Sequence, residues 1–206
     1  MARGHMLEKP AETAVPIHDL LANRWSPRAF TDRSVEPEKL VAVLEAGRWA
    51  ASSNNGQPWA FLIAQKDDAA AHDAMVARLM DGNQSWAALA PVLILTFVEP
   101  IWPGQDRANG TAMHDVGMAT AMMSIQAEAL GLRTHHMGGI HHDVIRSTYA
   151  VPEEFNPVSA IAMGYQGAAD LLTQEKDRAR EPNPRTRKSL DEIIFTGTFG
   201  TPAKLA

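Results

Sequence analysis

The sequence contains no cysteine among its 206 residues. Disulfide bonds, thiolate nucleophiles, thiolate zinc sites and iron–sulfur clusters are therefore excluded. Because the chain has no thiol for redox chemistry, an oxidoreductase built on this sequence must take its redox chemistry from a cofactor.

Long apolar runs and a surplus of positive charge are also lacking. No apolar run approaches the roughly 18 residues of a membrane-spanning helix, and no apolar stretch of a signal peptide opens the chain, so we expect a cytoplasmic location. The formal net charge is −5 and the basic residues are scattered. Such a chain has no general attraction for polyphosphate, so nucleic acid is not an expected partner.

Two common nucleotide-binding motifs, G-x-G-x-x-G and G-x-x-x-x-G-K-[ST], are absent, which argues against a dinucleotide-binding or phosphate-loop fold. The histidines fit no recognised metal site: there is no H-E-x-x-H, and neighbouring residues of a strand point to opposite faces. We therefore expect no metal. The histidines considered were His114, His135, His136, His141 and His142.

The apolar residues that are present, 45% of the chain, allow a sizeable core. Their spacing predicts helices over 17–22, 38–51, 68–80, 111–130 and 140–151, and strands over 59–64, 91–98, 133–140 and 158–167, with the first two strands buried. The helix over 111–130 is apolar almost all round, so its methionines are expected in the core. Residues 1–5 resemble an expression-tag remnant before a natural start at Met6, leaving 6–206 as one domain.

Two short segments hold closely spaced arginines. In "RWSPR", Arg24, Ser26 and Arg28 occupy alternate positions, so in an extended segment they share a face and could cradle a phosphate. In "PRTRKSL", Arg185 and Arg187 follow a proline-rich approach. Taken alone, each segment is more typical of a solvated loop or surface.

A run of uncharged polar residues, "SSNNGQ", lies between a predicted helix and a predicted strand. Hydroxyls and amides supply donors and acceptors without charge, which suits the edge of a planar heteroaromatic ring. The alternative is a helix C-terminus capped by Asn54, Asn55 and Gly56.

Six segments, in this order, carry a resemblance to a known family: "RWSPRAF", "AASSNNGQPWAF", "GNQSWAALAPVLIL", "LGLRTHHMGGI", "VSAIAMGYQG" and "RTRKSLDEII". Together they resemble the FMN-dependent nitroreductase family over nearly the whole chain after residue 5. The resemblance implies an α+β fold, a three-layer sandwich with a mixed, mostly antiparallel sheet flanked by helices. It also implies an intertwined homodimer with FMN sites at the subunit interface, in which the C-terminal segment crosses onto the partner.

The resemblance also implies roles for individual residues. Arg24 and Ser26 would bind the FMN phosphate, with Arg187 and Arg185 closing that site, and Arg28 would lie near the ring as a stabiliser of N1 and O2. The remaining implied cofactor contacts are Ser52, Ser53, Asn55 and Gln57 from the partner, the turn Met137, Gly138 and Gly139, and Gln84, with Asn83 as the alternative amide. A lysine found near that amide in some relatives has no counterpart here, where the sequence reads "SWAA".

The implied function is an NAD(P)H-dependent flavin oxidoreductase. It would transfer hydride by way of FMN to nitroaromatic, quinone or similar planar acceptors in a two-step, ping-pong mechanism, with no catalytic side chain. The alternatives on the same scaffold are reductive dehalogenation, azoline oxidation, flavin fragmentation and a low-turnover FMN-binding protein. Trp102 and the loop over 99–110 are expected to shape the acceptor site.

Overall fold

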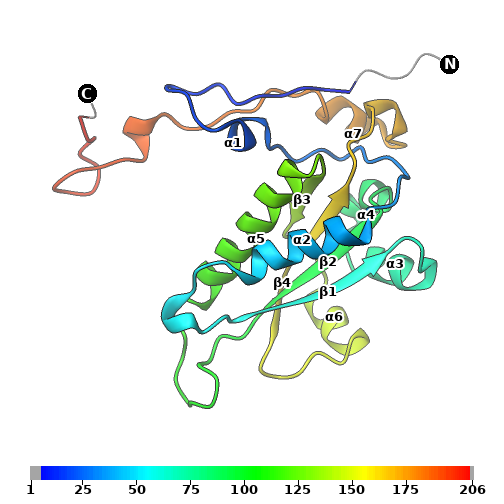
Figure 1. The fold of residues 1–206 in the computed structure, drawn as a ribbon, viewed down its shortest axis with the longest axis horizontal. Helices are drawn as coiled ribbons and strands as arrows, with labels where there is room; N and C mark the ends of the chain where they lie inside the picture. The colour runs from blue at the N-terminus through cyan, green and yellow to red at the C-terminus, as the bar shows by residue number, and fades with distance from the viewer. Residues whose placement is uncertain (1–5, 205–206) are drawn as a thin grey trace.

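The computed structural model describes residues 6–204, so the expression-tag prediction for residues 1–5 lies outside it. The chain alternates short helices with four strands (Figure 1). In chain order the helices and strands are α1 (Asp19–Asn23), α2 (Pro37–Arg48), η1 (Ser53–Asn55), β1 (Trp59–Gln65), α3 (Ala69–Val76), α4 (Asp81–Ala87), β2 (Val92–Val98), α5 (Ala112–Ala129), β3 (Arg133–Met137), α6 (His142–Thr148), β4 (Asn156–Gly164), η2 (Ala169–Leu171), α7 (Glu175–Arg180) and η3 (Leu190–Glu192).

The four strands form one sheet in the order β1-β2-β4-β3, with every neighbouring pair antiparallel. All seven residues of β2 are buried because this strand has neighbours on both edges and helices on both faces. In β1 only Ala64 is fully buried, so the prediction of a buried strand there was wrong. The reason is position, since β1 lies at an edge of the sheet.

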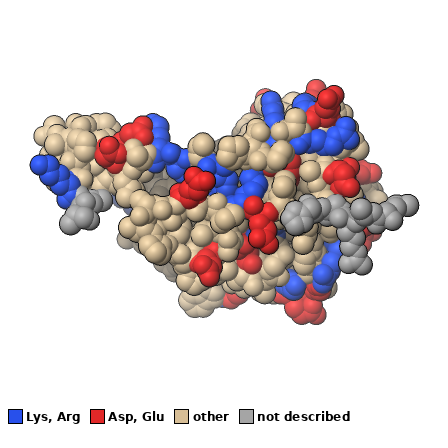
Figure 2. Space-filling view, turned by 90° about the horizontal axis from the view of Figure 1, so that it is seen from above, with Lys and Arg blue, Asp and Glu red and all other residues tan. Residues whose placement is uncertain are grey.

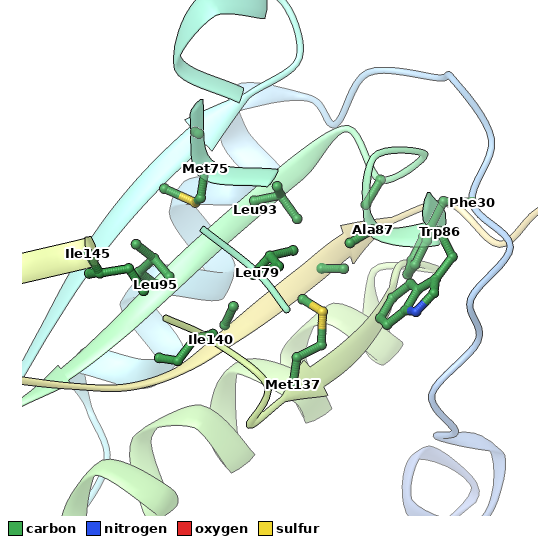
Figure 3. Close-up of a cluster of buried hydrophobic side chains, with 14 of the residues drawn as sticks. Phe30, Met75, Leu79, Trp86, Ala87, Leu93, Leu95, Met137, Ile140 and Ile145 are labelled. Atoms are coloured by element: carbon green, nitrogen blue, oxygen red, sulfur yellow. The ribbon is translucent and has the colours of Figure 1, made fainter. Parts of the chain in front are cut away.

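Alternating side chains of β2 feed two separate apolar clusters. Leu93 and Leu95 join Met75 and Trp86 of α3 and α4 in the cluster of Figure 3. On the other face, Ile94 packs with residues of α2 and α5. Helices therefore cover both faces of the sheet, which confirms the expected α+β, three-layer sandwich, with the sheet antiparallel throughout.

The long helix α5 buries only one side. Met123 is 1% exposed, but Met113, Met118 and Met122 are 57%, 38% and 44% exposed, so the expectation that all four methionines fill the core was wrong. Because apolar residues occur on every side of this helix, its composition could not distinguish the face that packs in the core from the face that is exposed. The helix ends as expected, because Gly131 has a positive φ of 74° that stops it.

Both ends of the chain lie along the top of the molecule in Figure 1. The C-terminal segment, residues 182–204, extends away from the sheet and exposes apolar side chains, among them Phe199 at 92%. Arg185 ties its start to the N-terminal segment by donating to the carbonyl oxygens of Lys9 and Ala22, at 2.6 Å each. No helix in the described part of the chain is long and apolar enough to span a membrane.

Candidate functional site

Three of the arginines singled out in the sequence converge from opposite ends of the chain. Arg24 follows α1, and its Nη1 lies 3.4 Å from the Ser26 hydroxyl. Burial lowers the pKa of Arg24, and the nearby positive charge of Arg187 lowers it further. Burial likewise lowers the pKa of Arg185, with Arg24 and Arg187 adding to the effect. Viewed from above, Lys and Arg side chains gather near the middle of this face (Figure 2).

This arginine cluster, Arg24, Arg185 and Arg187, fits a phosphate. Within residues 6–204 none of the three forms an ion pair with a carboxylate. Their positive charges also repel one another. A dianionic phosphate would relieve that repulsion, and guanidinium groups offer paired donors suited to it. The donor set therefore agrees with the phosphate end of FMN.

Arg28 has different surroundings. Its Nε lies 4.0 Å from Asp177 Oδ1 and its Nη1 lies 3.9 Å from Glu181 Oε2, and both carboxylates are buried. The guanidinium also lies 5.9 Å from the ring centroid of Trp86. The sequence-based role of Arg28 beside the flavin ring stays a prediction, and the structure adds that two buried carboxylates offset its charge.

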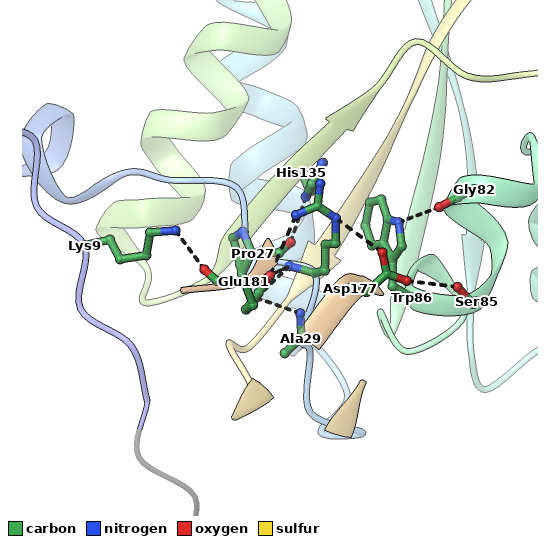
Figure 4. Close-up of polar contacts among 10 residues, drawn as sticks. Lys9, Pro27, Ala29, Gly82, Ser85, Trp86, His135, Asp177 and Glu181 are labelled. Atoms are coloured by element: carbon green, nitrogen blue, oxygen red, sulfur yellow. Dashed lines mark hydrogen bonds and ion pairs between the residues drawn. The ribbon is translucent and has the colours of Figure 1, made fainter. Parts of the chain in front are cut away.

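Glu181 fixes the backbone of the same segment (Figure 4). Its Oε1 accepts hydrogen bonds from the backbone N–H of Arg28 at 2.9 Å and of Ala29 at 3.1 Å. The Ser85 hydroxyl donates to Asp177 at 3.3 Å, which brings α4 into the network. Sequence reasoning missed both acids, because Asp177 and Glu181 lie in the charged run "EKDRARE", which is typical of a solvated surface.

The glycine turn after β3 contacts an amide. Asn83 Nδ2 donates to the Gly139 carbonyl oxygen at 3.2 Å, whereas Gln84 Nε2 donates to Leu79 O at 2.7 Å. A Cβ at Gly138 would meet nothing within 4 Å. Of the two amides considered, Asn83 is the one that lies against the turn. Met137, the first residue of the predicted turn, is buried at 3% exposure.

The two histidines of β3 point to opposite sides of the strand, as their adjacency indicates. The His135 ring lies 4.3 Å from that of Trp86, and its Nδ1 is 2.9 Å from the Pro27 carbonyl oxygen. His136 Nε2 is 2.8 Å from the Ser124 hydroxyl. The pKa of each is lowered to about 4, mainly by burial and, at His136, also by the positive charge of Arg24. Both rings are therefore neutral near pH 7.

The uncharged polar loop, Ser52–Gln57, forms a short 3₁₀ turn between α2 and β1. The Gln57 N–H donates to the Ser52 hydroxyl at 3.1 Å, and the Gln57 side chain donates to the Asn55 carbonyl oxygen at 3.2 Å. The Ser53 N–H donates to the buried carboxylate of Asp115 on α5 at 3.1 Å. α2 ends at Arg48 and its C-cap is Trp49, so Asn54, Asn55 and Gly56 lie beyond the end of that helix rather than at its cap.

Within one chain the loop and the arginine cluster lie apart (Figure 1). The loop contacts Asp115 near the start of α5, whereas Glu128, near the end of α5, is the carboxylate whose charge acts on Arg24. At 1.5 Å per residue, the two ends of this helix stretch are separated by about 20 Å. A single chain therefore does not bring the two halves of the expected cofactor site together.

Comparison with known proteins places the chain in one family. The family model described as "Nitroreductase family" matches residues 21–165, more than half of the chain. A solved structure described as an oxidoreductase containing FMN is 33% identical, covers 92% of this chain and 96% of its own, and superposes with a TM-score of 0.85.

Two further relatives are named for the same cofactor. A protein from a Desulfovibrio desulfuricans subspecies, solved in complex with FMN, is 27% identical with a TM-score of 0.70 and covers 91% of this chain and 99% of its own. The FMN reductase [NAD(P)H] of Bacillus subtilis (strain 168) is 26% identical over 163 residues, 70% of this chain and 64% of its own. On the family match and these likenesses, the chain belongs to the nitroreductase family.

Proposed function

We propose that this chain is an NAD(P)H-dependent flavin oxidoreductase that reduces nitroaromatic, quinone or similar planar acceptors in two half-reactions. FMN is its cofactor, and NAD(P)H is its reductant. The observation that carries the proposal is the arginine cluster, three cations held together with no carboxylate within ion-pair distance in the described part of the chain. Glu128, whose charge acts on Arg24 and Arg185, forms its ion pair with Arg133 instead. This cluster and Ser26 would hold the phosphate.

Bound FMN would supply the chemistry, accepting hydride from NAD(P)H and passing it to the acceptor. The chain itself contributes cofactor binding, cofactor orientation and an electrostatic field around the cofactor. Gly138 leaves room for a ring to approach the backbone after β3, and Asn83 beside it can orient that ring. Arg28, offset by Asp177 and Glu181, supplies a weakened positive field. No side chain is required as a nucleophile.

We further propose that residues 6–206 form one domain and that two copies build each pair of FMN sites. Support comes from the bare apolar face of α5 and from the separation between the Ser52–Gln57 loop and the arginine cluster in one chain. The exposed C-terminal segment would cross onto the partner. A cytoplasmic location, with access to NAD(P)H, completes the proposal.

An absorption spectrum of the purified protein tests the cofactor. We expect flavin bands, or their appearance in bound form when FMN is added, whereas colourless protein that does not bind FMN would contradict the proposal. Stopped-flow reduction with NADH and NADPH, followed by an acceptor screen, tests the reaction. Reduction too slow to support repeated turnover would favour a low-turnover FMN-binding protein. Sedimentation on dilution tests the dimer, which a flavin-loaded monomer would contradict.

A further inference from the structure

The Ser52–Gln57 loop has an unusual backbone. Asn54, Asn55 and Gln57 have positive φ angles of 48°, 55° and 47°. Residues other than glycine adopt this region at an energetic cost, and they remain there only where their surroundings hold them. The contacts around this loop therefore determine whether it keeps its shape.

Asp115 makes the deepest of these contacts. It lies in the first turn of α5, is 3% exposed, and accepts hydrogen bonds from the Ser53 N–H at 3.1 Å and the Thr111 hydroxyl at 3.4 Å. Within residues 6–204 it forms no ion pair with Lys, Arg or His. A buried carboxylate is costly unless its oxygens are hydrogen-bonded, and the positive end of the helix dipole favours it here.

The loop is also held from its other side. A Cβ at Gly56 would lie 2.8 Å from Cζ3 of Trp102, so the indole ring packs directly on the loop backbone. Packing of this kind restrains the loop but does not set the direction of its N–H groups. The hydrogen bond from the Ser53 N–H to Asp115 sets that direction, because it fixes the peptide group at the point where the residues with positive φ begin.

Resting on the function proposed above, we propose that Asp115 is a positioning residue for the cofactor: it fixes the Ser52–Gln57 loop, which then presents its amides and hydroxyls to FMN. Asp115 itself does not touch FMN. Since the loop and Arg24 lie at opposite ends of α5, Asp115 of one copy acts on the FMN whose phosphate is held by Arg24 of the other copy.

Three substitutions test the positioning role. We expect Asp115→Ala to raise the Kd for FMN about tenfold and Asp115→Asn to raise it about threefold, because the amide oxygen can still accept from the Ser53 N–H. Ser53→Pro, which removes that N–H at a helical first position where proline fits, should match Asp115→Ala. Ser53→Ala keeps the N–H and separates the effect of the hydroxyl.

The matched control is Asp143→Asn, another aspartate in the first turn of a helix, exposed and on α6. It should leave the Kd unchanged. The visible circular dichroism of bound FMN supplies a readout of ring environment, which should change in Asp115→Ala and not in the control. A fall in Tm of the FMN-free protein with unchanged Kd and unchanged dichroism would show a purely structural aspartate and overturn the proposal.

Mixed dimers test the action across copies. Arg24→Ala and Asp115→Ala, co-expressed with different tags and purified as the mixed pair, should regain one site of wild-type affinity out of two, since both defects fall in the other site. Two weakened sites, or recovery of monomers only, would overturn this part. If the wild-type chain binds no FMN, the proposed function fails. If wild type binds FMN and Asp115→Ala binds it with the same Kd, only the present inference fails.

Discussion

Asn83 lies against Gly139, with its Nδ2 3.2 Å from the Gly139 carbonyl oxygen and 2.7 Å from the position that a Cβ on that glycine would occupy. At the neighbouring Gly138 a Cβ would meet nothing within 4 Å. Two adjacent glycines therefore face different surroundings, one filled by an amide and one open.

This contrast predicts different outcomes for two matched substitutions. Gly138→Ala should leave the free energy of unfolding of FMN-free protein within about 0.5 kcal/mol of wild type, yet weaken FMN binding, since the new methyl group occupies space proposed for the ring. Gly139→Ala displaces the Asn83 amide and should cost about 1 kcal/mol of stability. Urea unfolding and FMN titration measure both. Unweakened FMN binding in Gly138→Ala would remove this turn from the cofactor site.

The arginine cluster predicts that Arg24→Ala binds FMN roughly 10- to 100-fold more weakly, as expected for loss of one charge-assisted contact to phosphate. Because Arg24 and its neighbour Arg187 repel each other, the FMN-free variant should be no less stable than wild type. Titration by FMN fluorescence quenching measures the Kd. The control is Arg180→Ala, an exposed arginine on α7. If Arg24→Ala purifies fully yellow, the phosphate assignment is wrong.

Much of the fold could be predicted because, in its central elements, the spacing of apolar residues along the sequence matches their burial in the structure. The run 91–98 reads as a buried strand, and β2 occupies 92–98 with every residue buried. The helix predicted over 68–80 is shorter in the structure, where α3 ends at Val76. Two short helices, α4 and α7, were not predicted, because their sequences, DGNQSWA and EKDRAR, hold too few apolar residues to show a helical spacing.

Less of the candidate site could be predicted, because its partners are distant in sequence. Composition and spacing singled out Arg24 and Ser26, which the structure does bring together. Nothing in the sequence indicates that Glu181 reaches back across 153 residues to the backbone of Arg28. Asp115 did carry a signal, since it is one of only two acids on a long, mostly apolar helix, but only the structure identifies Ser53 as its partner.

The Glu181 network predicts a large effect on stability. Glu181→Ala leaves two backbone N–H groups without their acceptor and Arg28 with one carboxylate fewer, which should cost roughly 3–5 kcal/mol. Urea unfolding measures the loss. Glu175→Ala, exposed on the adjacent α7, should leave the unfolding midpoint unchanged. A similarly small effect in Glu181→Ala would mean that the carboxylate does not hold the loop.

His135 predicts a pH dependence of stability. Burial, together with the smaller effects of the nearby Arg28 and His136, lowers its pKa in the folded protein to about 4 from an ordinary value of 6.5. Between pH 6.5 and 4 the unfolded chain therefore binds a proton that the folded protein does not. The stabilising contribution is complete above pH 6.5 and is lost as the pH falls towards 4.

The matched test is His135→Asn, which keeps a donor for the Pro27 carbonyl oxygen but does not titrate. Wild type should lose on the order of 1 kcal/mol more of its unfolding free energy than the variant between pH 7 and pH 5. Equal losses in the two proteins would show that His135 does not remain neutral on folding.

Trp102 predicts a change in acceptor choice. Its ring packs on Gly56 within the Ser52–Gln57 loop, and its backbone N–H bonds to Arg107 O at 2.9 Å, so it joins the loop over 99–110 to the proposed cofactor-facing loop. Removing the ring in Trp102→Ala opens space beside that loop. We therefore expect kcat/KM for a large quinone, divided by kcat/KM for a small nitroaromatic, to change several-fold. A change of this size is typical when an apolar contact in a substrate pocket is lost. Trp49→Ala removes an equal ring that is 71% exposed and should leave the ratio unchanged. If both variants keep the wild-type ratio, Trp102 packs the loop without shaping the acceptor site.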